Sequence, residues 1–227
     1  MYFSRVTLMP HLLSRTEKMT MFGGSAYSDH QLLWRMFSSE QRGFLFRKEY
    51  GGHNDNGLTQ SLPVYYVVSD EVPNDTLGLD IATKEYNPVI DVGMTFGFSL
   101  RANPVVAHKI EGRKNNSRRD VLLVAKAQAK EQGVEPLLPM DLAAKKWLLQ
   151  RTENAGFSVE ADQLLHDGHI MQKFSKKGAK APITISMLDY DGLLTVTDVD
   201  LFRKTLFEGI GRARGFGCGM MMIRKVA

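Results

Sequence analysis

The stretch Gly209-Ile210-Gly211-Arg212-Ala213-Arg214-Gly215-Phe216-Gly217-Cys218-Gly219 lies between the last helix and the last strand that the sequence predicts. The helix covers residues 198–208: it begins with a capping pattern at Thr197–Asp200, and Gly209 marks its end. A strand is predicted at 219–225. Five glycines in the stretch alternate with two arginines. Glycine backbone and guanidinium groups suit close approach to a phosphate chain.

The elements that precede this stretch have a recognisable order. β-Branched and aromatic residues predict strands near 2–9, 43–50, 62–68 and 94–101, with a helix from about Ser28 and a short helix near 73–80. This order is that of a ferredoxin-like fold. The second half repeats it less clearly, with strands near 104–110, 158–165, 182–196 and 219–225 and helices at 141–152 and 198–208. We therefore predict an α+β protein with a boundary at Asn103-Pro104.

Composition excludes several classes of function. The chain has 227 residues and a net charge of +4, which permits a polyanionic partner. The single cysteine, Cys218, excludes an intramolecular disulfide and a multi-cysteine zinc site, and favours a reducing, cytoplasmic setting. No apolar run is long enough for a membrane span, and no signal peptide is expected. We expect no metal, because His166-x-x-His169 lacks cysteine support. We expect no cofactor, since Arg214 replaces the third glycine of a dinucleotide-binding motif and no P-loop occurs.

One histidine near the start of a helix is a candidate for proton transfer. If Ser28 caps the helix, His30 lies in its first turn, where partial positive charge favours a phosphate. Tyr27 lies close enough to orient that phosphate, and Arg35 supplies a cation five positions later. A lone histidine is more often simply exposed on a surface helix, and that alternative stays open.

Two basic clusters are predicted at loops or hairpin tips, near residues 111–119 and 173–180. Such tips can follow the phosphates of an RNA duplex, which proteins recognise mainly by shape and backbone. The alternative is a pair of solvated charged turns.

Four segments together resemble the CasE family, the CRISPR RNA-processing endoribonuclease of the type I-E Cascade complex. They are Met1–Val6, Tyr27–His30, Leu100-Arg101-Ala102-Asn103-Pro104 and Gly209–Gly219. The resemblance implies two tandem ferredoxin-like domains: residues 1–101 with the catalytic histidine, and residues 104–227 with a basic hairpin and the glycine-rich loop. It also implies a metal-independent endoribonuclease that binds the stem-loop of CRISPR repeat RNA and stays bound in Cascade with other subunits. Its single cut, at the 3′ base of the stem, would leave a 2′,3′-cyclic phosphate and a 5′-hydroxyl.

The resemblance also assigns residues to these roles. The catalytic residues would be His30, Tyr27 and Arg35. Arg214 stands where the family often has lysine, and Arg212 where it often has proline. The RNA-binding residues would be Arg113, Arg118, Arg119, Lys173, Lys176, Lys177, Lys180, Arg212 and Arg214. Two alternatives remain: a non-catalytic RNA-binding subunit of a CRISPR complex, and a ferredoxin-like scaffold protein without a nucleic-acid role.

Overall fold

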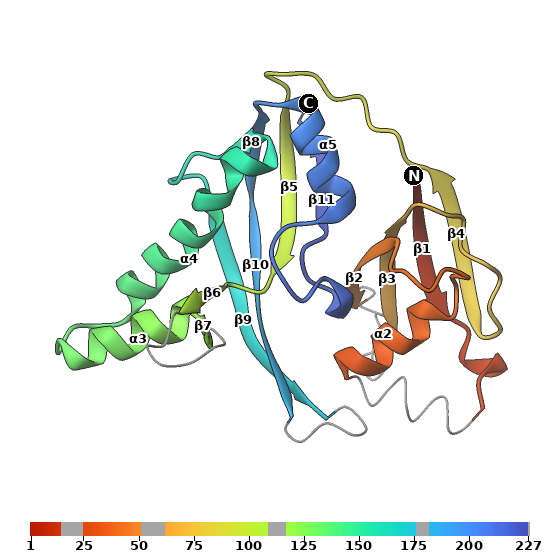
Figure 1. The fold of residues 1–227 in the computed structure, drawn as a ribbon, viewed down its shortest axis with the longest axis horizontal. Helices are drawn as coiled ribbons and strands as arrows, with labels where there is room; N and C mark the ends of the chain where they lie inside the picture. Colours follow the sequence, from red (N-terminus) through yellow and green to blue (C-terminus); the bar gives the residue numbers. More distant parts are fainter. Residues whose placement is uncertain (15–24, 51–61, 109–116, 176–181, 227) are drawn as a thin grey trace, which may run out of the picture.

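The structure is a computed structural model that describes residues 1–14, 25–50, 62–108, 117–175 and 182–226. These residues form two units, each built on an antiparallel sheet (Figure 1). The two sheets lie side by side, and the glycine-rich segment reaches from the second unit towards the first.

The first unit is a four-stranded sheet with the strand order β2-β3-β1-β4. Leu32 and Leu33 of helix α2 pack against this sheet, in one core with Val6, Phe46 and Tyr65. The elements are β1 (Tyr2–Leu8), the short helix η1 (Pro10–Leu12), α2 (Ala26–Trp34), β2 (Phe44–Tyr50), β3 (Pro63–Ser69) and β4 (Leu79–Glu85).

The second unit is a sheet with the order β11-β5-β10-β8, and β9 also pairs with β10. Strands β6 and β7 form a separate two-stranded ladder. Its strands are β5 (Thr95–Ala102), β6 (Val105–His108), β7 (Ser117–Asp120), β8 (Phe157–Ser158), β9 (Leu165–Phe174), β10 (Ile183–Val196) and β11 (Met221–Lys225). Its helices are α3 (Val121–Glu131), α4 (Leu137–Thr152), η2 (Glu153–Ala155), α5 (Val199–Glu208) and η3 (Arg214–Phe216).

Both sheets have the ferredoxin-like strand order, in which the first and third strands are central and the fourth lies beside the first. In the first unit β1 pairs with both β3 and β4. In the second unit β5 pairs with β10 and β11. The predicted fold class, α+β with two ferredoxin-like units, is confirmed.

The fourth strand of the first unit differs from the prediction. Residues 79–85 form β4, so the short helix predicted near 73–80 is wrong. The strand predicted at 94–101 is β5, and it belongs to the second sheet rather than the first. The chain therefore passes from the first sheet to the second between Glu85 and Thr95, and not at the predicted boundary of 101–104. Strand β4 escaped notice because it is an edge strand whose residues after Leu79 are mostly exposed, which weakens the hydrophobic signal.

Several further elements of the second unit differ from the prediction. Strand β6 leaves the main sheet and pairs with β7. In place of the strand predicted at 158–165, the structure has the two-residue strand β8 and then the long, mostly exposed strand β9. Helix α3 was not predicted; it begins where the side chain of Asp120 accepts hydrogen bonds from Leu122 N and Leu123 N.

Helix α5 lies as predicted. The carboxylate of Asp198 caps it by accepting a hydrogen bond from Leu201 N at 2.9 Å. Phe202 and Leu206 are buried against the second sheet. The helix ends at Gly209, whose φ of +77° lies in the left-handed region that favours glycine. This end fixes where the glycine-rich segment starts.

Candidate functional site

Helix α2 begins three residues earlier than predicted. Its N-cap is Ser25, whose hydroxyl accepts a hydrogen bond from Ser28 N at 3.1 Å. The predicted cap at Ser28 is therefore wrong, and His30 is the fifth residue of the helix rather than part of its first turn. The unpaired N–H groups of a helix end lie in the first turn, so they do not act on His30.

The glycine-rich segment holds the His30 ring instead. Its Nδ1 atom lies 2.8 Å from the carbonyl oxygen of Gly215 in η3. A carbonyl can only accept a hydrogen bond, so Nδ1 carries a proton. The rings of Phe216 and Trp34 lie 5.4 Å and 5.9 Å away, centroid to centroid, and fix the plane of the imidazole. The other nitrogen, Nε2, is thus the one that can take up or release a proton.

Close backbone contacts shape the glycine-rich segment. Ile210 N donates to the carbonyl oxygen of Gly219 at 2.9 Å, and Gly219 N donates to that of Arg101 at 2.7 Å. A Cβ on Gly209 would lie 2.8 Å from the carbonyl oxygen of Gly219, so a larger residue would push the two ends of the segment apart. The hydrogen bond from Gly219 to Arg101 attaches the segment that contacts His30 to strand β5.

Tyr27 lies beside His30, as predicted. The two rings are 6.4 Å apart, with an interplanar angle of 25°. On its other side Tyr27 stacks on Phe174, the last residue of β9, at 6.4 Å. The end of the β9–β10 hairpin therefore forms part of the wall around His30.

The predicted arginines differ in position. Arg35 follows the last residue of α2 and is exposed. Arg214 lies in η3, one residue before Gly215, and its Nε donates to Gly211 O at 3.0 Å. Arg212 is exposed within the same segment. The structure thus places Arg214 next to the residue that holds His30.

One cation near His30 was missed by the sequence analysis. The Nη1 atom of Arg42 and the Nδ1 atom of His30 each lie 3.3 Å from the point where a Cβ would stand on Gly215. Partial burial, and then the positive charge of Arg214, lower the pKa of Arg42. Arg42 precedes β2 without a basic neighbour in the sequence, so no charge cluster marked it.

Lys173, Arg118 and Arg119 lie on the side of the β9–β10 hairpin that faces away from Tyr27. Lys173 is exposed and pairs with Thr184, and Thr184 lines a cavity of about 390 Å³ together with Arg118 and Arg119. Since side chains alternate along a strand, Lys173 faces away from the side on which Phe174 contacts Tyr27. Arg113, Lys176, Lys177 and Lys180 lie outside the described residues.

Buried polar contacts anchor helix α2 next to His30. Asp29 is 5% exposed and accepts hydrogen bonds from Lys48 Nζ at 2.9 Å and from the hydroxyl of Tyr65 at 2.6 Å. Burial first, and then the Asp29 charge, raise the pKa of Tyr65. A buried charge needs such partners. The trio fixes the helix to strands β2 and β3.

A network of ion pairs joins the two units. Arg101 of β5 binds both carboxylate oxygens of Asp189, with Nε to Oδ1 at 2.8 Å and Nη2 to Oδ2 at 2.7 Å. Its Nη1 donates to the carbonyl oxygen of Lys48 in β2 at 2.8 Å. Arg47 pairs with Glu49 and donates to Ser99 Oγ at 2.8 Å. Arg101 of the predicted junction motif thus fastens the first sheet to the second.

The two histidines of the His166-x-x-His169 pair have separate carboxylate partners. His166 Nε2 lies 3.0 Å from Asp141 Oδ1, and His169 Nε2 lies 3.1 Å from Asp120 Oδ2. Among the described residues, no group of three or more His, Cys, Asp or Glu side chains could hold a metal ion. The pair joins β9 to helices α4 and α3.

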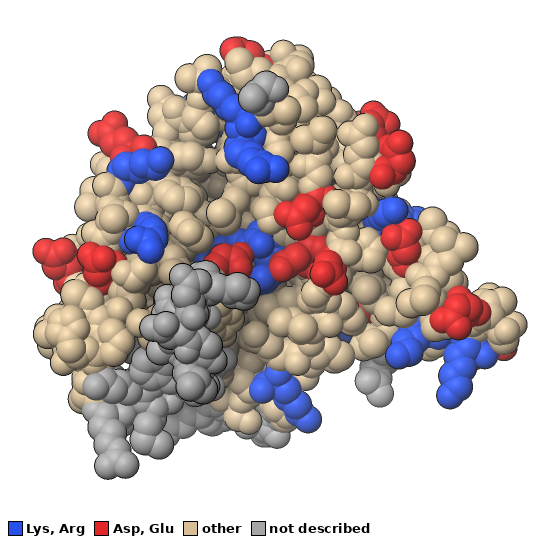
Figure 2. Space-filling view, turned by 180° about the vertical axis from the view of Figure 1, so that it is seen from behind, with Lys and Arg blue, Asp and Glu red and all other residues tan. Residues whose placement is uncertain are grey.

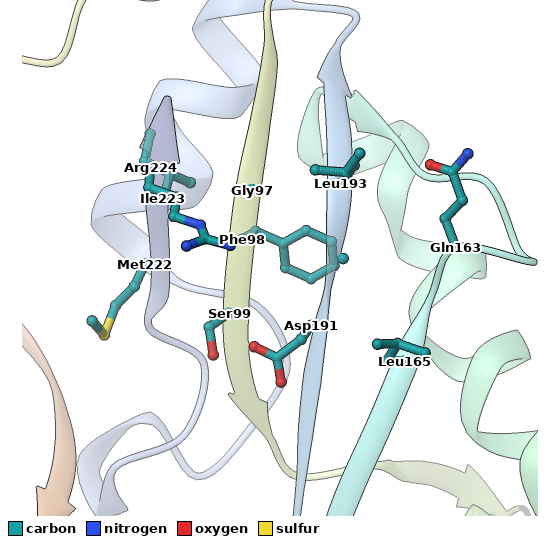
Figure 3. Close-up of a pocket in the computed structure, with 11 residues that line it drawn as sticks. Gly97, Phe98, Ser99, Gln163, Leu165, Asp191, Leu193, Met222, Ile223 and Arg224 are labelled. Atoms are coloured by element: carbon teal, nitrogen blue, oxygen red, sulfur yellow. The ribbon is translucent and has the colours of Figure 1, made fainter. Parts of the chain in front are cut away.

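A cavity of about 780 Å³ lies on the second sheet, away from His30 (Figure 3). Figure 3 shows Ser99 of β5 and Asp191 of β10 close together, with the side chain of Arg224 across Gly97. None of the residues that line it is one of the predicted site residues. Cavity size therefore does not identify the site; the contacts of His30 do.

Charge is mixed on the face seen in Figure 2, where acidic and basic side chains lie close together near the centre. In the described part of the chain, no helix has the length and apolar character needed to cross a bilayer.

Comparison with known proteins identifies the family. The family described as CRISPR associated protein matches residues 1–225. This chain belongs to that family. The predicted resemblance to CasE is confirmed by CRISPR system Cascade subunit CasE of Escherichia coli strain K12, which is 27% identical over 206 residues, covering 87% of this chain and 90% of the relative.

Solved structures share the fold. The CRISPR-associated protein Cas6e from Escherichia coli K-12 is 24% identical, with a TM-score of 0.66 and 100% of both chains covered. The CRISPR endoribonuclease Cse3 bound to a 19-nucleotide RNA is 20% identical, with a TM-score of 0.70 over 99% of this chain and 100% of the other. Thermus thermophilus Cse3 bound to an RNA representing a pre-cleavage complex is 19% identical, with a TM-score of 0.66 over 98% of each chain.

Proposed function

We propose that this chain is a metal-independent endoribonuclease that binds the stem-loop of CRISPR repeat RNA and cuts at the 3′ base of the stem. The observation that carries the proposal is the hydrogen bond between His30 Nδ1 and Gly215 O, which orients an imidazole where the two units meet. The relatives named as CasE and as CRISPR endoribonuclease Cse3 support it.

The chemistry follows from the orientation of His30. The 2′-hydroxyl of the nucleotide before the cut attacks the adjacent phosphorus in line, and the bond to the 5′-oxygen breaks. His30 Nε2 removes the hydroxyl proton as a base or, when protonated, delivers a proton to the leaving 5′-oxygen. Such positioned proton transfer accelerates a reaction by about a hundredfold to ten-thousandfold. The products are a 2′,3′-cyclic phosphate and a 5′-hydroxyl. Because the substrate supplies the nucleophile, the reaction needs no metal to generate one.

Tyr27 and Arg35 complete the proposed catalytic set. Tyr27 lies against the His30 ring and would orient the phosphate or share in proton transfer. Arg35 would offset negative charge on the phosphorus centre in the transition state. Arg35 is the C-cap of α2, the helix that carries His30.

The remaining basic residues would bind the RNA stem. Arg214 and Arg212 lie in the segment that contacts His30, and Lys173, Arg118 and Arg119 lie on the other side of the β9–β10 hairpin. We place Arg113, Lys176, Lys177 and Lys180 in the same role from the sequence alone. The product RNA would stay bound and join other Cascade subunits in the cytoplasm.

The test is cleavage of the cognate repeat stem-loop in EDTA by wild type, His30→Ala and the exposed-residue control His11→Ala. We expect wild type and His11→Ala to cut, His30→Ala to bind without cutting, and a 2′-deoxy nucleotide before the cut to abolish cleavage. Cleavage by His30→Ala at the wild-type rate would refute the assignment of His30. Wild type that binds and never cuts would favour the non-catalytic RNA-binding subunit.

A further inference from the structure

Two guanidinium groups from different units line one cavity beside His30. Arg42 precedes β2 in the first unit, and Arg214 lies in η3 of the second. Both line a cavity of about 410 Å³. A Cβ on Gly215 would touch the Arg42 guanidinium and the His30 ring together, at 3.3 Å from each. The Arg42 guanidinium and the His30 ring thus lie on the same side of Gly215.

Arg42 and Arg214 carry like charges and line the same cavity. Within the described ranges, the ion pairs include neither Arg42 nor Arg214. Partial burial first, and then repulsion by the positive charge of Arg214, lower the pKa of Arg42. An anion bound between two such cations removes the repulsion and gains charge-assisted hydrogen bonds.

We propose that Arg42 and Arg214 bind one backbone phosphate of the RNA, adjacent to the phosphate that is cut at His30. This inference rests on the proposed function, because it takes the RNA strand past the imidazole. Guanidinium groups suit the site, since they present several donors in a fixed plane to phosphate oxygens. Bound there, the phosphate sets the register of the strand without reading its bases.

The other charged residues of the cavity limit what it can hold. Asp70 and Glu208 also line it. Asp70 lies against the backbone of Gly43, because a Cβ there would be 2.2 Å from its carboxylate oxygens. Two carboxylates opposite two guanidinium groups disfavour a multiply charged group. The cavity therefore suits a singly charged phosphodiester, and Asp70→Asn should tighten RNA binding.

The test measures the salt dependence of RNA binding. The probe is repeat stem-loop RNA with a 2′-deoxy nucleotide before the cut, and fluorescence anisotropy gives Kd between about 50 and about 200 mM salt. The variants are Arg42→Ala and Arg42→Lys. The control is Arg203→Ala, which removes a half-buried arginine that donates to Asn87 Oδ1 at 3.0 Å, outside the cavity of Arg42 and Arg214. Urea unfolding confirms that each variant is folded.

We expect Arg42→Ala to weaken binding by on the order of tenfold and to reduce the slope of log K against log salt by about 1. Arg42→Lys should keep the slope, because it keeps the charge, but bind more weakly than wild type. Arg203→Ala should match wild type. An unchanged slope for Arg42→Ala would overturn the phosphate site. The salt slope could fall in Arg42→Ala while wild type fails to cut repeat RNA that has every 2′-hydroxyl. That result would support the phosphate site and refute the proposed endoribonuclease activity.

Discussion

Arg101→Met tests the connection between the two units. The change keeps an unbranched side chain in β5 but removes three hydrogen bonds, two to Asp189 at 2.7 and 2.8 Å and one to Lys48 O at 2.8 Å. Breaking a fully buried ion pair costs about 3–5 kcal/mol, and breaking an exposed one about 0–1 kcal/mol. Arg101 and Asp189 side chains are 21% and 25% exposed. We therefore expect the free energy of unfolding to fall by about 2–4 kcal/mol.

Urea unfolding followed by tryptophan fluorescence measures this loss. The chain has two tryptophans. Trp34 packs against the core of the first unit and Trp147 lies in the core of the second, so tryptophan fluorescence follows the unfolding of both units. The matched control Arg203→Met should change stability by less than about 0.5 kcal/mol.

The double variant Arg101→Met with Asp189→Leu separates the charge from the packing. Removing both charges should recover at least half of the loss, because no half-buried carboxylate is left without the two hydrogen bonds that Arg101 donates to it. A loss below about 0.5 kcal/mol in Arg101→Met, or a further loss in the double variant, would refute the reasoning.

Three further predictions concern single residues. Cys218 is 0% exposed, and burial raises its pKa to about 12 from 9.0. Near neutral pH the thiolate fraction should therefore be about a thousandfold lower in the folded protein than in the unfolded chain, and iodoacetamide labelling measures the difference in reactivity. The same shift should lower the free energy of unfolding as pH rises from about 9 to about 12, because the unfolded thiol loses its proton first; a flat profile there would contradict it. Gly156→Ala should destabilise by several kcal/mol or prevent folding, since φ is +77° and a Cβ would lie 2.4 Å from Phe202 N; near wild-type urea stability would count against this. Ser25→Ala should cost about 1 kcal/mol by removing the cap of α2, and no change in thermal unfolding would contradict the cap.

The sequence predicted those elements whose signals are local. Helix α5 has its capping carboxylate, its buried stripe and its terminal glycine within twelve consecutive residues, and it lies as predicted. Strands β4 and β9 were missed because they are largely exposed, so their residues do not show the alternation of a half-buried strand. The sequence analysis assigned β5 to the first unit. The sheet to which a strand belongs depends on which strands pair with it, and β5 pairs with β10 and β11, which are far away in the sequence.

The candidate site shows the same division between local and distant information. Tyr27 and His30 are neighbours in sequence and lie together. The capping serine was misplaced because Ser25 and Ser28 both suit an N-cap. The bond from His30 to Gly215 and the approach of Arg42 join residues from different units, and no spacing in the sequence encodes them.

The contact between His30 and Gly215 spans 185 positions of the chain. A ribosome adds about 5–20 residues per second, so roughly 10 to 40 seconds pass between synthesis of the imidazole and synthesis of the carbonyl that orients it. During that interval the nascent polypeptide carries the histidine without its acceptor. On the proposed mechanism, a nascent chain therefore cannot orient the imidazole for RNA cleavage until the second unit has emerged and folded.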